Sequence, residues 1–174
     1  GLVGAGRSEV MRALMGYDKK GGGEVYLEGK QVVIKHPEDA IKNRIVMASE
    51  DRKQLGLVVC RNIRENIALQ NLDQFSRSSF INKHAERQKC NEYAVKMTTK
   101  MNSINDLVES LSGGNQQKVV LAKSLLSNPK VLIMDEPTRG IDVGAKASIY
   151  NIMVDLARQG MAIIMISSEL PELI

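Results

Sequence analysis

The segment at residues 111–142, LSGGNQQKVVLAKSLLSNPKVLIMDEPTRGID, restricts the possible folds of this chain more than any other part of the sequence. It contains two groups of residues suited to handling phosphate, and the stretch between them has the apolar spacing of a helix. The second group directly follows a short apolar run that is typical of a buried parallel strand. A helix followed at once by such a strand indicates an α/β protein.

The first group is a small-residue turn at the beginning of the predicted helix. Ser112, Gly113 and Gly114 occupy this turn. The first amides of a helix have no partner within the helix, and glycine lets a phosphate approach the backbone closely. These three residues therefore predict an anion site.

The second group is a pair of carboxylates after the apolar run at 131–134. Ligands of open α/β sheets bind at the carboxyl ends of the strands. There Asp135 can hold Mg²⁺, directly or through water, and Glu136 can take a proton from an attacking water. The alternative for each carboxylate is a solvated helix cap, which an acidic pair placed directly after a strand disfavours.

The composition is that of a globular protein. The chain has 174 residues, of which 43% are apolar and 25% charged, which indicates one α/β domain or most of one. Its net charge of +4 comes from Lys and Arg scattered along the chain, so we expect no nucleic-acid surface. No apolar run approaches the roughly 18 residues that a membrane span needs, and no signal peptide is visible. Any membrane contact would therefore be made through a partner.

The cysteines and histidines do not form a metal-binding pattern. Cys60 and Cys90 lack metal or redox spacing, and Cys90 shares an apolar helix face with Ala94 and Met97. We expect both cysteines to be core thiols in a reducing compartment. The two histidines lack a partner at ligand spacing, so surface or loop positions are expected for them.

The first eight residues, GLVGAGRS, fit the phosphate-loop pattern G-x-x-x-x-G-K-[ST], except that Arg7 stands where Lys is expected. In such a loop the backbone amides cradle phosphates, and the Ser8 hydroxyl would ligate Mg²⁺. Arg7 keeps the positive charge, but its planar fork is longer and bulkier than an ammonium group. We therefore expect nucleotide binding to persist while catalysis suffers. The residues expected in the phosphate cradle are Gly1, Gly4, Ala5, Gly6, Arg7 and Ser8.

Further elements follow from the spacing of apolar residues and turn residues. The expected elements are a helix over 9–15, a hairpin of strands 24–27 and 32–34, a helix over 37–43, buried parallel strands over 45–48 and 161–166, and a helix over 144–159 closed by Gly160. Between 62 and 110 the sequence is polar and helical, which predicts an inserted helical subdomain. Strand, helix and strand with right-handed crossovers give a doubly wound core.

Two features leave more room for interpretation. The polar cluster at 49–53 follows a strand, and contact with a metal and a partner or a solvated loop fits it about equally well. A phosphate loop hangs from a preceding strand, which this sequence does not include, and the chain stops as a new helix begins. We therefore expect a single partial domain over residues 1–174, truncated at both ends.

Together these motifs resemble the ATP-binding-cassette (ABC) ATPases, and the likeness runs nearly end to end. Its most specific part is the signature LSGGNQQ at 111–117 shortly before a Walker B segment at 131–136, with a D-loop at 140–142. The stretches GLVGAGRSE, SEDRK, DEPTRGIDVGAK and SSELPEL are similar to the C-terminal ATPase half of bacterial monosaccharide importers of the ribose, galactose and xylose type. In that group two cassettes share one polypeptide.

The resemblance implies a P-loop NTPase fold with a mostly parallel sheet, an antiparallel hairpin region and a helical subdomain at 62–110. It implies ATP and Mg²⁺ as cofactors, with Glu136 catalytic and with Ser8 and Asp135 at the metal. The implied partners are the N-terminal cassette of the same polypeptide, transmembrane permease subunits at the cytoplasmic face of the membrane and, indirectly, a periplasmic or extracellular sugar-binding protein. The remaining residues implied in nucleotide binding are Glu50, Ser112, Gly113, Gly114, Asn115, Gln116, Asp142 and Ser168.

Three positions depart from the general family pattern. Arg7 replaces the phosphate-loop Lys, Glu50 stands at the Q-loop position where Gln is usual, and Ser168 stands where the switch His follows the last strand. Glu cannot donate a hydrogen bond as Gln can, and Ser cannot act as an imidazole. The same replacements resemble the C-terminal half of the sugar importers, and they predict that the chain's own nucleotide site is degenerate.

In ABC dimers each ATP lies between the phosphate loop of one cassette and the signature of the other. We therefore expect this chain's signature to complete its partner's site, where hydrolysis mainly runs, while closure drives alternating access in the membrane subunits. Two alternatives stay open: a catalytically silent, nucleotide-gated structural half with a vestigial Glu136, and a soluble ABC protein acting on ribosomes or DNA. The second alternative predicts long coiled coils or basic arms, which the sequence lacks.

Overall fold

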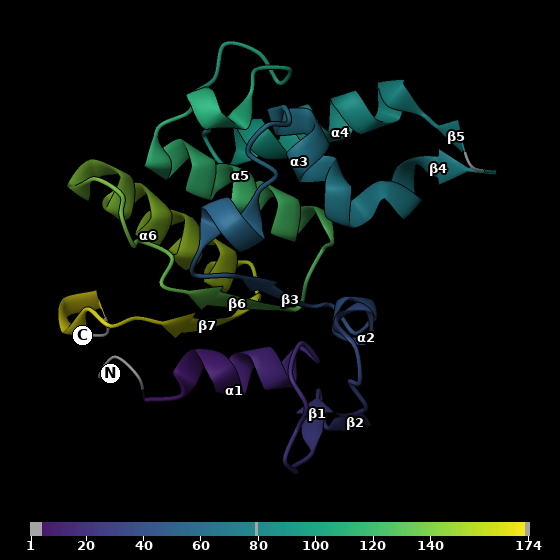
Figure 1. Cartoon of the computed structure of the whole chain (residues 1–174), viewed down its shortest axis with the longest axis vertical. Helices are drawn as coiled ribbons and strands as arrows, with labels where there is room; N and C mark the ends of the chain where they lie inside the picture. The colour runs from purple at the N-terminus through teal and green to yellow at the C-terminus, as the bar shows by residue number, and fades with distance from the viewer. Residues whose placement is uncertain (1–4, 79, 173–174) are drawn as a thin grey trace.

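The computed structural model describes residues 5–78 and 80–172, and its centre is a three-stranded parallel sheet. The parallel strands and the helices are β3 (Ile45–Ala48), β6 (Val131–Asp135), β7 (Ala162–Ile166), α1 (Arg7–Leu14), α2 (Pro37–Lys42), α3 (Ile63–Ala68), α4 (Lys83–Lys96), α5 (Gly113–Leu126) and α6 (Val143–Arg158). The strands lie in the order β3, β6, β7, and Figure 1 shows α1 on one side of the sheet and α5 with α6 on the other. This is the α/β fold expected from the sequence.

β6 is the central strand, and alternate side chains along it enter two separate apolar clusters. Leu132 and Met134 are fully buried in the cluster that contains Leu121 of α5. Ile133 is fully buried in the other cluster, which contains Met15 at the end of α1. Because burial of each such side chain stabilises the fold by about 1.5–3 kcal/mol, the two clusters hold β6 firmly between the helical layers. The polar residues that follow β6 are thereby fixed in position.

β7 departs from the prediction of a fully buried strand. Ala162 is exposed and Ile164 is 37% exposed, whereas Ile166 is buried at the carboxyl end. The reason is that β7 is the edge strand of the three described parallel strands and pairs with β6 alone. Its apolar sequence therefore does not translate into burial along the whole strand.

The predicted hairpin is present, but its second strand begins at Lys30 rather than Val32. β1 (Val25–Leu27) pairs antiparallel with β2 (Lys30–Val32). Glu28 and Gly29 form the connecting turn with φ angles of 52° and 76°. Two consecutive positive φ angles are typical of the tight two-residue turn that joins neighbouring strands, and this turn sets the register.

The two cysteines lie in different surroundings. Cys90 is fully buried with Ala94 and Met97 at the inner face of α4, as predicted, and burial raises the pKa of its thiol to about 12. Cys60 is exposed, so the prediction of a second core thiol is wrong. It lies in the loop before α3, where no apolar periodicity fixes which side chains turn inward.

The segment between β3 and α5 packs on α5. α3 and α4 both contribute to the apolar cluster that covers α5, and Figure 1 shows them next to it on the side away from α1. Between α3 and α4 the chain forms a small hairpin of β4 (Ser76–Arg77) and β5 (Phe80–Ile81), which was not predicted. Strands of two residues are too short to produce a recognisable alternation of apolar and polar residues.

A buried asparagine fixes the loop that leads into α3. The side-chain oxygen of Asn66 accepts a hydrogen bond from the Val58 amide at 2.7 Å, and its amide donates to the carbonyl oxygens of Val58 and Asn62 at 3.1 and 3.0 Å. Asn66 is 1% exposed, so its side chain makes these hydrogen bonds out of contact with water.

Replacing Asn66 with Ala should lower the free energy of unfolding by roughly 2–3 kcal/mol, because it leaves buried backbone groups without hydrogen-bond partners. Chemical denaturation followed by circular dichroism measures the effect. The control is Asn105→Ala at an exposed position, which should change the free energy of unfolding by less than about 0.5 kcal/mol. Equal effects of the two substitutions would contradict the role assigned to Asn66.

Candidate functional site

The carboxylate of Asp135 lies at the end of β6 and is 3% exposed. Burial raises the pKa of Asp135, while a hydrogen bond with the Ser8 hydroxyl and the charge of Arg7 act in the opposite direction. Its Oδ1 atom has no hydrogen-bond partner among the described residues. A buried carboxylate oxygen of this kind, next to a hydroxyl, fits a hard divalent cation such as Mg²⁺, which prefers oxygen ligands. The two residues predicted at the metal are thus neighbours.

Arg7 connects the beginning of α1 with the end of β7. Its Nη1 atom donates to the carbonyl oxygen of Ser167 at 2.7 Å. Gly6, directly before α1, has a φ angle of 74°, which suits the turn into the helix. Ala5 is exposed, and Gly1 and Gly4 of the predicted phosphate cradle lie outside the described residues.

Glu136 occupies a strained position after β6. Its φ angle of 46° lies in the left-handed region, which costs a non-glycine residue about 1–2 kcal/mol. A hydrogen bond from its amide to the carbonyl oxygen of Ile166 at 2.9 Å supports this geometry. The Ser168 hydroxyl donates to Glu136 Oε2 at 3.1 Å, so the predicted base and the residue at the switch position are in contact.

Glu50, at the position where the family usually has Gln, forms an ion pair with Arg139. Arg139 was not among the predicted site residues. The opposite charges in the stretches SEDRK and DEPTRGID were the available signal, but only the tertiary structure brings the two loops together. The carboxylate of Glu50 therefore already has a cationic partner within the chain.

The predicted signature residues form the beginning of α5, where Ser112 is the residue before the helix. Asn115 donates to Ser112 Oγ at 3.0 Å, and its side-chain oxygen accepts from the amide of Lys100 at 2.9 Å. Gln116 is 5% exposed and donates to the carbonyl oxygen of Val108 at 3.2 Å. The side-chain amides of Asn115 and Gln116 thus bind within the protein and stabilise the turn.

Gly114 lies against the first turn of α6. A Cβ atom at Gly114 would be 2.4 Å from Ala145 Cβ, a distance that no packed structure tolerates. Asp142 begins α6, because its carboxylate accepts a hydrogen bond from the Ala145 amide at 2.9 Å. The predicted signature and D-loop residues are therefore side by side, and glycine is required where they touch.

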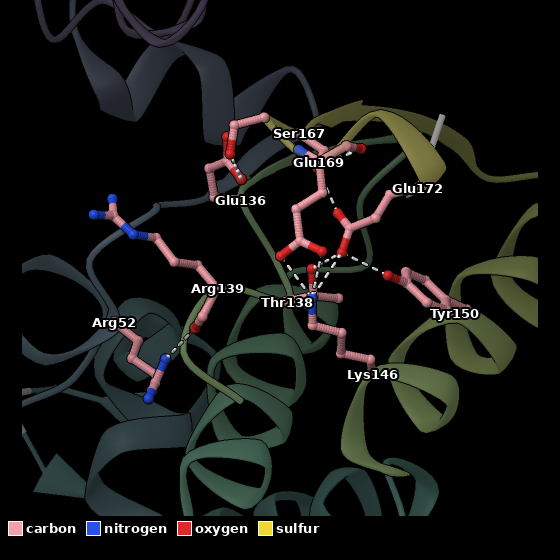
Figure 2. Close-up of polar contacts among 10 residues, drawn as sticks. Arg52, Glu136, Thr138, Arg139, Lys146, Tyr150, Ser167, Glu169 and Glu172 are labelled. Atoms are coloured by element: carbon pink, nitrogen blue, oxygen red, sulfur yellow. Dashed lines mark hydrogen bonds and ion pairs between the residues drawn. The ribbon is translucent and has the colours of Figure 1, made fainter. Parts of the chain in front are cut away.

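A buried carboxylate that the sequence analysis did not single out joins several of these loops. The Glu172 side chain is 4% exposed and accepts hydrogen bonds from the hydroxyl groups of Thr138, Ser167 and Tyr150 (Figure 2). Lys146 of α6 lies 3.4 Å from it. Burial alone would raise the pKa of Glu172, but these hydrogen bonds outweigh it and lower the pKa to about 2. The network connects the loop after β6, helix α6 and the segment after β7.

A groove of about 420 Å³ lies between the α1–β3 part of the chain and α5, with Leu69 and Gln70 also in its wall. Its lining is mixed, with apolar Met47 and Leu55 beside polar Ser49 and Lys123. Leu55 remains 63% exposed, which makes an apolar surface available at the edge of the groove.

Helices that begin at glycines, with a carboxylate and a hydroxyl group close together at the carboxyl end of a central parallel strand, are typical of nucleotide-binding α/β domains. Residues 1–139 match the family described as ABC transporter, and the chain belongs to this family. Among the described residues, 5–78 and 80–172, no helix has both the length and the apolar character to cross a bilayer.

Curated relatives resemble the chain along its whole length. It is 55% identical over 174 residues to the ribose import ATP-binding protein RbsA of Halalkalibacterium halodurans and 53% identical over 175 residues to the xylose import ATP-binding protein XylG of Thermoanaerobacter pseudethanolicus. Each alignment covers 100% of this chain and 35% of the relative, so the chain spans about a third of the length of these proteins.

Solved structures share the fold. The chain superposes on the ADP conformation of MJ1267, an ATP-binding cassette of an ABC transporter, with a TM-score of 0.78, 23% identity and coverage of 98% of this chain and 68% of that one. For a dimeric post-hydrolysis state of the cassette MJ0796 bound to ADP and Pi, the TM-score is 0.74 at 21% identity, with 95% and 71% covered. The ABC cassette fold expected from the resemblance is confirmed.

The Glu172 network should make the stability of the protein depend on pH. The pKa of Glu172 lies below its ordinary value of 4.5, so its contribution is complete above pH 4.5 and is lost as the pH falls toward about 2. Glu172→Gln should therefore lower the free energy of unfolding by roughly 3 kcal/mol at pH 7, and the difference from the unchanged protein should shrink below pH 4.5.

The matched control is Glu169→Gln, because Glu169 pairs with the same Lys146 at 2.6 Å but its side chain is 51% exposed. This exposed pair should contribute less than about 1 kcal/mol. Urea denaturation at several pH values measures both variants. A loss for Glu172→Gln that is the same at pH 3 and pH 7 would show that its charge does not stabilise the fold.

Proposed function

We propose that this chain is an ATPase half of an ABC importer that drives the uptake of a monosaccharide. The observation that carries the proposal is the identity of about one half, over the whole chain, to proteins named ribose and xylose import ATP-binding proteins. These names do not favour a soluble ABC protein that acts on ribosomes or DNA. The proposed location is the cytoplasmic face of the membrane.

In this proposal, ATP binds with Mg²⁺ at the phosphate loop. Ser8 and Asp135 would hold the metal, which would neutralise phosphate charge, and Glu136 would accept the proton of the attacking water. The contact between Ser8 and Asp135 and the unpartnered buried oxygen of Asp135 support this assignment. The cradle residues Gly1, Gly4, Ala5, Gly6 and Arg7 would contact the phosphates.

Three contacts support a weak site at this phosphate loop. Arg7 is bound to the carbonyl oxygen of Ser167, and its planar fork must divide its donors between protein and phosphate. Glu50 is paired with Arg139 and cannot donate to a water. Ser168 already donates to one oxygen of Glu136 and cannot take up a proton as a histidine can. ATP binding without rapid turnover fits these contacts.

The signature of this chain would act on the ATP of its partner cassette. Ser112, Gly113 and Gly114 begin α5, where the first amides of the helix are suited to a phosphate. Asn115, Gln116 and Asp142 support this surface from within, through the contacts described above. Hydrolysis at the partner's phosphate loop would then depend on an intact signature here.

The proposed partners are the N-terminal cassette of the same polypeptide, the transmembrane permease subunits and, indirectly, a periplasmic or extracellular sugar-binding protein. The length of the relatives supports a further cassette, since this chain matches about a third of each. The groove beside Leu55 offers an apolar surface for a permease segment. We further propose a single cassette domain over 1–174, with the helical subdomain at 62–110 that packs on α5.

The decisive experiment measures ATP binding and turnover with Mg²⁺ in the complete two-cassette protein. Gly113→Asp should lower turnover by about 100-fold, because it places a side chain and a negative charge at the phosphate surface, whereas Arg7→Ala should lower it less than about threefold. Ser112→Ala is a milder second variant at the signature. Thermal melting of each variant separates a loss of activity from a loss of folding.

The two possible outcomes lead to different conclusions. A strong loss of ATP turnover in the signature variants, together with near-normal turnover in Arg7→Ala, supports a half that mainly contributes its signature to the partner's site. Equal loss for Arg7→Ala would make this phosphate loop a working catalytic site and would overturn the proposed asymmetry. Glu136→Gln tests the alternative of a catalytically silent half: a silent half predicts unchanged turnover, whereas the proposed weak site predicts a small loss.

A further inference from the structure

Arg52 reaches from the segment after β3 to the loop after β6 and to helix α5. Its Nη1 atom donates to the carbonyl oxygen of Arg139 at 2.9 Å (Figure 2), and its Nη2 atom donates to that of Gly140 at 3.3 Å. Its Nε atom donates to the side-chain oxygen of Gln116 in α5 at 3.4 Å. One guanidinium therefore joins the beginning of the D-loop to the first turn of the signature helix.

The backbone that carries Arg52 is itself fixed. Arg52 begins a π-helical turn, Arg52–Gly56, and the Asp51 carboxylate accepts hydrogen bonds from the amides of Lys53 and Gln54 at 2.9 Å each. At the other end of the turn, a Cβ atom on Gly56 would lie 3.2 Å from Val120 of α5, so the turn rests closely on this helix. The position of Arg52 relative to α5 is thus set from both ends of the turn.

Gly113 gives a second connection between Arg52 and the signature. A Cβ atom at Gly113 would lie 2.8 Å from Arg52 Nη2 and 3.2 Å from the carbonyl oxygen of Gly140. A side chain at this position would push the guanidinium away from the acceptors that it bridges. Glycine at this position therefore leaves room for the Arg52 guanidinium in the place where it bridges its acceptors.

The ion pair between Glu50 and Arg139 ties the same two loops together nearby. Glu50 is 37% and Arg139 67% exposed, so water screens this pair. The hydrogen bonds of Arg52 are charge-assisted and also reach α5, which the ion pair does not. Arg52 therefore connects one segment more than the ion pair does.

We propose that Arg52 is a positioning residue that holds the signature turn at a fixed spacing from the D-loop, so that both can meet the nucleotide of the partner cassette together. The proposal rests on the proposed function, in which this chain lends its signature. A lysine cannot replace Arg52, because its single ammonium group lacks the rigid fork needed to reach two adjacent carbonyl oxygens and a side chain of α5 together.

The test compares Arg52→Ala and Arg52→Lys with Gly113→Asp and Arg158→Lys in the complete two-cassette protein. Each Arg52 variant should lower kcat for ATP hydrolysis about tenfold, while the binding of a fluorescent ATP analogue and the thermal melting temperature stay unchanged. Arg158→Lys is the control for loss of a guanidinium, because Arg158 is 77% exposed and pairs only with Asp155 in the part of the chain that the structure describes. It should leave kcat unchanged.

A double variant tests whether Arg52 affects kcat through the signature. If Arg52 acts through the signature, adding Arg52→Ala to Ser112→Ala should lower kcat less than the product of the two single effects. Normal kcat in both Arg52 variants, with activity lost in Gly113→Asp, would overturn the role of Arg52 and leave the proposed function intact. A fall in kcat matched by a fall in melting temperature or ATP affinity would make Arg52 merely structural. Normal kcat in Gly113→Asp would instead reject the proposed function.

Discussion

The burial of β6 on both faces is the constraint on which the rest of this structure depends. Leu132 and Met134 pack toward α5, and Ile133 packs in the cluster on the α1 side. Since neither layer can shift without exposing one of these side chains, the strand ends at a fixed point. Asp135 and Glu136 are therefore delivered to the edge of the sheet where β7 also ends and α1 begins. The chemistry of the candidate site is a consequence of this apolar packing.

Beyond the apolar core, polar contacts hold the loops in position. Glu172 collects donors from the loop after β6, from α6 and from the segment after β7, while Arg52 joins the loop after β3 to the D-loop and to α5. The two groups lie on different sides of the residues that follow β6 (Figure 2). Loops that carry glycines and strained residues such as Glu136 need such external support, because their own backbone does not hold one conformation. Rigidity at this edge of the sheet thus comes from a few well-placed charged groups.

Much of the architecture was predictable, because the helices and central strands carry strong apolar periodicity. The family, the parallel sheet, the helix after the signature and the first hairpin were all predicted and are confirmed. The errors fall where local sequence is a poor guide to burial: β7 is apolar but lies at the edge, and Cys60 lies in an irregular loop. The hairpin of β4 and β5 was missed because its strands are too short to show a pattern.

For the candidate site, too, some features followed from the sequence and others only from the tertiary structure. The sequence by itself indicated which residues are suited to phosphate and metal chemistry, since it shows glycine-led turns and an acidic pair directly after a strand. It also determined that Arg7, Glu50 and Ser168 differ from the usual family residues. The tertiary structure alone decided what these residues contact: Glu50 meets Arg139 and Ser168 meets Glu136. Such partners are far apart in the chain, and their approach is set by how the helices pack on β6, which no local pattern encodes.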